Sequence, residues 1–178
     1  MARNPDNAKI WVNAAVRVSL ALVRPALPAT IDADWVEDDW PEVGILDGKD
    51  GFGEERSSDE TKHYGWGIGL IRIGTKNFEL ARTFSPLEKN ALTEAIINPG
   101  STSTKRKMPK PVNGWVAFET DSDIGDKERL VTTRRSRLWV PADNRNESDI
   151  TKWEVTASVF ADGNDDVFDR QALEVAQP

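Results

Sequence analysis

Residues 44–67 read GILDGKDGFGEERSSDETKHYGWG, a glycine-rich and acidic stretch between apolar segments. A phosphate-binding loop is disfavoured because GKDGFG lacks the Lys-[Ser/Thr] ending and opens no helical pattern. A calcium loop starting at Asp47 is disfavoured because Lys49 stands where an oxygen ligand is required. Asp47-Gly48 and Asp50-Gly51 are common turn pairs. The stretch therefore predicts a turn or an extended arm, and we place this loop at residues 47–62.

Alternating apolar residues on both sides of this loop predict strands. GWGIGLIRIG (65–74) places Trp66, Ile68 and Leu70 on one face and leaves glycines on the other, where another layer or chain can approach. Further strands are predicted at residues 14–23, 77–84, 114–120, 129–140 and 152–161. The last of these, KWEVTASVFA, predicts a half-buried antiparallel strand.

One helix is predicted at about residues 86–97, in SPLEKNALTEAIINPG. Ser85 is placed as the N-cap, Pro86 at the first helical position and Glu88 at the third. Asn98-Pro99-Gly100 ends the helix. The next stretch, STSTKRKMPKP, has no periodicity and predicts an exposed loop over residues 101–111. The fold class is therefore mainly β: an antiparallel sandwich or barrel with one flanking helix and long extended loops.

The composition narrows the function. The 178 residues include no cysteine and one histidine, which excludes thiol chemistry and any mechanism that needs two imidazoles. A net charge of −7 disfavours a surface that grips nucleic acid through its phosphates. The first 23 residues imitate a secretory signal, but Arg17 interrupts the apolar run and the pattern alternates, so we predict structure there. The composition favours one soluble domain, made in the cytoplasm, without membrane, metal or cofactor.

Three other stretches allow functional interpretations. ADGNDDVFDRQALE (161–174) resembles a calcium loop, but Val167 and Leu173 replace its glycine and its bidentate glutamate, so a turn is favoured. The carboxylates near Trp35 and Trp40 would suit a glycosidase only if two of them flanked a cleft. A carbohydrate-binding module would use the two tryptophans, if they are exposed, to stack on sugar rings. The basic groups at residues 105–110 and 134–137 fit a solvated loop and a paired strand as well as a polyanion site. These patterns identify no catalytic residue, and we predict that the protein is not an enzyme.

The order of these segments resembles the major tail tube protein of long-tailed, siphovirus-like bacteriophages, particularly those that infect actinobacteria. The resemblance covers roughly residues 14–173. It is carried by the alternating strand that ends in ALVRPALPATID, then by EVGILDGKDGFGEERSSDET, HYGWGIGLIRIG, NFELARTFSPLEKNALTEAI, NGWVAFET and KWEVTASVFADG. It rests on this order and not on a short motif.

The resemblance implies a subunit that forms hexameric rings, which stack into the tube through which DNA is ejected. Its partners would be copies of itself, the tape-measure protein and other tail proteins, and its location the virion. DNA would pass the lumen without specific binding. The N-terminal arm (residues 1–13), the loop 47–62 and the basic segment would make contacts between subunits, at Asp47, Gly48, Asp50, Gly51, Phe52, Glu54, Glu55, Arg56, Lys105, Arg106 and Lys107. The alternatives are a tail terminator or neck protein, a capsid-decorating protein, or a carbohydrate-binding β-sandwich.

Overall fold

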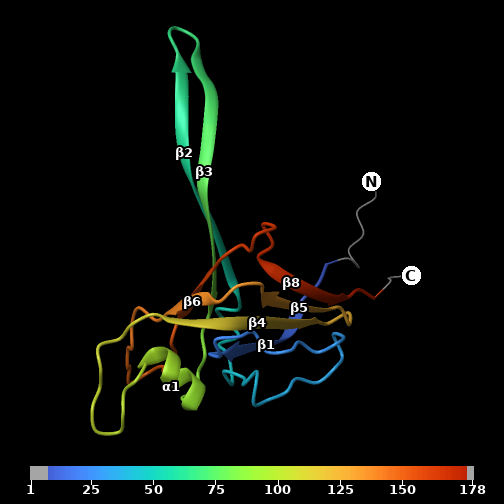
Figure 1. The fold of residues 1–178 in the computed structure, drawn as a ribbon, viewed down its shortest axis with the longest axis vertical. Helices are drawn as coiled ribbons and strands as arrows, with labels where there is room; N and C mark the ends of the chain where they lie inside the picture. The colour runs from blue at the N-terminus through green and yellow to red at the C-terminus, as the bar shows by residue number, and fades with distance from the viewer. Residues whose placement is uncertain (1–7, 176–178) are drawn as a thin grey trace.

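The computed structural model describes residues 8–175 and is mainly β, as the sequence predicts (Figure 1). All strand pairs are antiparallel. The elements are β1 (Trp11–Ser19), β2 (Gly53–Gly65), β3 (Gly69–Phe84), α1 (Ala91–Ile97), β4 (Val112–Ser122), β5 (Lys127–Thr132), β6 (Ser136–Trp139), β7 (Val155–Val159) and β8 (Phe168–Leu173).

The strands form two groups that β4 joins. β4 pairs with β1 over residues 115–122, with β5 over 117–121 and with β6 over 112–114. β5 continues the first group to β8, and β6 continues the second to β7, β3 and β2. The chain changes groups at residues 133–135, so the single strand predicted over 129–140 is two strands. In β-sandwiches, the chain forms a corner where it passes from one sheet to the other through a bulge or bend, and residues 133–135 are such a place.

The core lies between the two groups, around Phe118 of β4. Its ring makes edge-to-face contacts with Phe52, Phe84 and Phe168, at centroid distances of 5.5, 6.0 and 6.3 Å. Valines of β1, β4 and β7 and two isoleucines of α1 complete the cluster. Phe52 was predicted as an intersubunit contact. In the structure its ring is half-buried and packs against the core of its own subunit.

The period-two patterns of β1 and β7 are confirmed. Val16 and Val18 of β1 are fully buried, and the Trp153, Val155, Ala157 and Val159 side of the β7 segment is buried as well. β1 begins at Trp11, so residues 11–13 of the predicted N-terminal arm belong to a strand. Residues 1–7 of that arm lie outside the described residues.

The predicted helix exists but begins later than expected. It starts at Ala91, and Asn90 is the N-cap: its side chain accepts a hydrogen bond from the Thr93 N–H, and the Thr93 hydroxyl accepts one from the Asn90 N–H. Residues 85–87 are extended, because their backbone pairs with residues 45–47 (Leu87 N–H to Ile45 O, 2.8 Å). This tertiary pairing overrides the capping signal at Ser85. The predicted end of the helix, before Asn98, is correct.

Candidate interaction surface

A two-stranded hairpin formed by β2 and β3 stands out from the body (Figure 1). The two strands pair from Gly53↔Thr83 to Gly65↔Gly69, but β3 pairs with β7 only over residues 80–84. Within residues 8–175, β2 has no second partner strand. Residues 53–62, which the sequence analysis placed in a loop, therefore form most of β2.

The hairpin turns at residues 66–68, inside the stretch for which one continuous strand was predicted. The Ile68 N–H donates to the Gly65 carbonyl at 3.2 Å. Gly67 and Gly69 have φ values of 73° and 92°, which L-residues rarely adopt. The glycines of GWGIG thus make the turn and are not a flat face for another layer. Trp66 lies at the tip, fully exposed to solvent.

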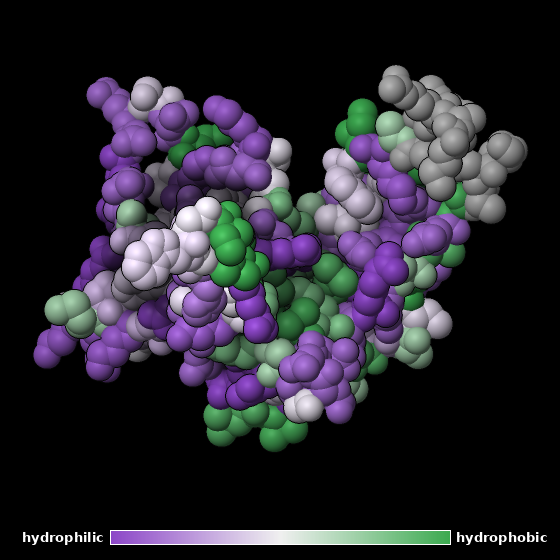
Figure 2. Space-filling model, turned by 90° about the horizontal axis from the view of Figure 1, so that it is seen from above, coloured by the Kyte–Doolittle hydropathy of each residue, from purple (hydrophilic) through white to green (hydrophobic). Residues whose placement is uncertain are grey.

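Large apolar side chains gather at the distal end of the hairpin and are exposed. Figure 2, in which the hairpin points toward the viewer, shows hydrophobic and pale residues there beside strongly hydrophilic ones. Monomeric soluble proteins rarely expose apolar groups in such concentration without a binding role. The exposed residues are Tyr64, Trp66, Ile68, Leu70, Ile71 and Ile73, with Phe78 further down β3.

The root of the hairpin is fixed to the body. Phe84 and Phe52 flank the root and pack on Phe118. Arg82 lies over the ring of Phe118, 5.0 Å from its centroid, and bonds Glu54 at 3.0 Å. Burial alone would raise the pKa of Glu54, but hydrogen bonds from Arg56 and Arg82 outweigh it and hold the pKa below its usual value. The hairpin is therefore a rigidly rooted projection.

The loop before β2 is held against the body. Lys152 Nζ bonds Asp47 and Asp50 at 2.8 and 2.6 Å, and the Ser85 hydroxyl donates to Asp50 at 3.0 Å. The hydrogen bonds from Lys152 lower the pKa of both carboxyls and raise that of Lys152. Gly48 and Gly51 lie in the same loop. This region is consequently part of the body and not a free arm.

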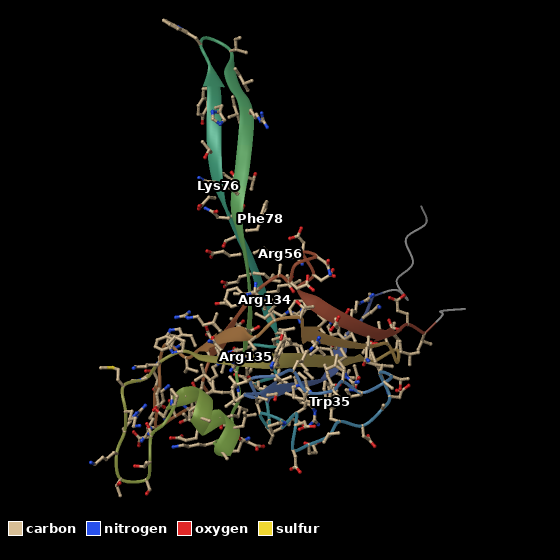
Figure 3. All side chains as sticks on the ribbon, in the orientation of Figure 1. Trp35, Arg56, Lys76, Phe78, Arg134 and Arg135 are labelled. Atoms are coloured by element: carbon tan, nitrogen blue, oxygen red, sulfur yellow. The ribbon has the colours of Figure 1, made fainter. Side chains whose placement is uncertain are left out.

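The remaining predicted contact residues fall in two separate segments of the chain. Glu54, Glu55 and Arg56 are at the root of β2, and Figure 3 labels Arg56 there. Lys105, Arg106 and Lys107 are exposed in a segment without helix or strand, where Arg106 bonds Asp143 at 2.8 Å. The sequence analysis named no residue of the distal hairpin as a contact residue and predicted one continuous strand there, although Gly65, Gly67 and Gly69 around Trp66 are a turn signal.

The long connection between β1 and β2 packs on the outer face of the β1, β4 and β5 strands. Trp40 is fully buried there against Ala117 and Val131, and its Nε1–H donates to the Ala26 carbonyl at 3.1 Å. Trp35 packs on Trp40, with Arg129 4.5 Å above its ring. Neither indole is free to stack on a sugar ring, so the carbohydrate-binding alternative loses the side chains on which it rested.

Buried Arg129, 3% exposed, ties this connection down. Its guanidinium donates to the carbonyls of Thr30 and Ile31 at 3.1 and 3.2 Å, to Gln171 Oε1 at 2.9 Å, and to Glu119. Arg17 likewise holds a later part of this connection, because its guanidinium donates to the Trp40 carbonyl at 3.0 Å. Backbone carbonyls without regular partners are thereby satisfied.

Among residues 8–175, no group of three or more His, Asp or Glu side chains is placed to hold a metal ion. No helix in the same part of the chain has the length and apolar character needed to cross a membrane.

The comparisons with known proteins find likeness among solved structures alone. No family model matches the chain, and no curated protein matches it. Among solved structures, a chain of an extracellular contractile injection system, the PVC sheath-tube complex in its extended state, is similar over 95% of both chains. The sequence identity is 11% and the TM-score 0.46.

Proposed function

We propose that this protein is a non-enzymatic structural subunit that assembles with copies of itself into the stacked rings of a phage-type tail tube. The observation that carries the proposal is the projecting hairpin, whose distal apolar side chains have no covering layer within residues 8–175. The segment order that resembles tail tube proteins supports the same assignment.

An isolated two-stranded hairpin is at best marginally stable in water. Each apolar side chain that a partner covers contributes about 1.5–3 kcal/mol of burial. Six such side chains lie within residues 64–73, so contact with another molecule stabilises the hairpin far more than its own ladder does. A permanent partner fits this exposure better than a transient ligand.

The arrangement of the subunit suits head-to-tail assembly. β2 and β8 are the two ends of the strand order. Sheet edges and apolar projections of this kind are liabilities in a monomer, and pairing across subunits removes them. A contact between two different surfaces of one chain generates rings or open stacks. The sequence resemblance alone is the basis for four further parts of the proposal: six subunits in each ring, a lumen that conducts DNA, contact with a tape-measure protein, and a place in the virion.

The test is removal of the distal hairpin. Residues 61–74 are replaced by Asn-Gly, which joins Glu60 and Thr75, neighbours in the ladder, through a two-residue turn. We expect the subunit to fold with an unchanged thermal midpoint and to form no tubes by electron microscopy, whereas the wild type forms them. Tubes from the shortened chain, or a wild type that stays monomeric at all concentrations, would contradict the proposal. Single rings that never stack would favour a terminator or neck protein.

A deletion of residues 48–58, which the predicted arm would tolerate, is unsuitable for this test. It removes Phe52 from the core and Asp50 from the Lys152 contact, so loss of assembly would follow from loss of folding.

A further inference from the structure

The distal half of the hairpin is basic in an acidic protein. Residues 61–74 contain Lys62 and Arg72 and no acid, in a chain whose net charge is −7. Both cations are exposed, and neither forms an ion pair within residues 8–175. They lie among the exposed apolar residues of the tip, so this end of the molecule combines apolar area with positive charge.

The opposite combination occurs in residues 31–42, which we call the acidic segment. It contains six Asp and Glu residues and no Lys or Arg. Asp32 pairs with Lys127 at 2.7 Å, and Glu37 and Glu42 pair with Arg17 at 2.8 and 3.0 Å. Three exposed carboxylates have no ion pair in the described part of the chain: Asp34, Asp38 and Asp39.

An exposed apolar side chain lies within the acidic segment. Val36 is 58% exposed, between Asp34 and Glu37 in the sequence. Leu22 and Val23, earlier in the same connection, are exposed as well. An apolar centre with charged surroundings is the usual anatomy of a protein interface.

The two surfaces lie on opposite sides of the body. Arg129 and Trp40 hold the acidic segment on the outer face of the β1, β4 and β5 strands. The hairpin root packs on the inner face of the same strands, through Phe84 and Phe118. Figure 3 shows the same separation, with Trp35 below the strands and Lys76 on the hairpin above them.

We propose that the distal hairpin of one copy docks on the acidic segment of the next copy along the tube. The inference rests on the proposed function and names the partner surface of the hairpin. Two complementary surfaces on opposite sides of one subunit give a polar, open-ended stack, because each copy offers a hairpin at one end and a receptor at the other. Charge complementarity of this kind fixes register and suppresses wrong orientations.

Nucleic acid fits the distal hairpin less well than a second copy does. The tip offers two cations, whereas affinity for a phosphate backbone rises with the number of phosphates neutralised. The root of the same hairpin carries five acids against three bases, a net negative charge that disfavours a duplex lying along it: Glu54, Glu55, Asp59, Glu60 and Glu79 against Arg56, Lys76 and Arg82.

Charge exchange tests the contact. The first variant carries Lys62→Glu and Arg72→Glu, the second Asp38→Lys and Asp39→Lys, and the third all four substitutions. Arg137→Glu with Arg145→Glu is the matched control, since both arginines are exposed on the body. The measurements are the critical concentration for tube formation by sedimentation, electron microscopy, and circular dichroism to verify folding.

We expect each of the first two variants to raise the critical concentration by about tenfold or more. In the third variant, which carries all four substitutions, the critical concentration should return to within about twofold of the wild-type value. The control should assemble normally. The docking would be overturned if the first and second variants fold and assemble like the wild type. It would also be overturned if the third variant has a critical concentration as high as those of the first two. If the hairpin deletion still blocks assembly in that case, the tube function stands without this contact. Duplex DNA binding that the first variant loses while it still assembles would assign the tip to nucleic acid and also overturn the inference.

Discussion

Two regions lie outside the paired strands of the body, and they differ in how far their tryptophan side chains are buried. The irregular connection between β1 and β2 buries Trp40 completely, whereas the regular β2–β3 hairpin leaves Trp66 fully exposed. The connection has no strand ladder, but arginine side chains donate hydrogen bonds to its carbonyls and it packs on apolar side chains of the strands. The hairpin has a strand ladder, but no apolar layer covers its distal end in the described part of the chain. Backbone regularity and packing are therefore separate sources of stability, and the region that lacks packing is the one expected to find it in another copy.

Tryptophan truncation gives the largest expected contrast. Trp40→Ala removes a fully buried side chain, so the free energy of unfolding should fall by about 3–5 kcal/mol. Trp66→Ala removes one that touches mainly solvent, and the free energy of unfolding should stay within about 0.5 kcal/mol. Urea denaturation of the unassembled subunit measures both. Similar losses in the two variants would show that the hairpin tip packs on its own body.

Arginine replacement sharpens the comparison at a smaller scale. Arg129→Met leaves carbonyls of the connection without a partner and leaves Glu119 with only its 3.8 Å ion pair to Arg17, which should cost about 3 kcal/mol. Arg56→Met in the hairpin removes a surface pair with Glu54, which is worth about 1 kcal/mol or less. Thermal or urea unfolding provides the measurement. An Arg129→Met protein as stable as the wild type would mean that apolar packing alone holds the connection.

These contrasts also show what the sequence could predict. Alternation in β1 and β7 was readable because each strand buries one face, as at Val16, Val18, Val155 and Ala157. Trp40 and Trp66 look alike in the sequence, because burial depends on which distant strands the segment reaches. The helix start at Ala91 was hidden for the same reason, since residues 85–87 pair with residues 45–47.

The sequence analysis placed the contacts mainly in the loop before β2, whereas the surface proposed from the structure is the distal end of the hairpin that follows this loop. Acidic and glycine-rich residues 47–51 drew attention as an arm, yet Lys152, about 100 residues later, holds them to the body. No local pattern reports such a long-range ion pair. The turn at Trp66 has a glycine signal in the sequence, but GWGIGLIRIG also alternates like a strand, and the positive φ values of Gly67 and Gly69 decide between the two.

The contact of Lys152 with Asp47 and Asp50 should make the loop before β2 sensitive to acid. Both carboxyl pKa values are lowered by the hydrogen bonds from Lys152. A carboxyl whose pKa is lowered in the folded state contributes its full stabilisation of that state at pH values above the ordinary pKa of 3.8. This stabilisation is lost as the pH falls through the lower pKa of the folded state. Below about pH 4 the loop should therefore loosen, while the tip, whose exposed residues have no such contact, should not change.

Hydrogen exchange measures this smallest effect. Protection of the Asp47 and Leu87 amides, which bond Ser85 and Ile45 carbonyls, should decrease between pH 5 and pH 3 after correction for the intrinsic rate. An Asp47→Asn, Asp50→Asn variant is the control: it cannot form the ion pairs, so protection should already be low at pH 5 and change little. Equal acid sensitivity in the variant and the wild type would place the titrating group elsewhere. Unchanged protection in both would mean that backbone pairing with residues 85–87 holds the loop without help from Lys152.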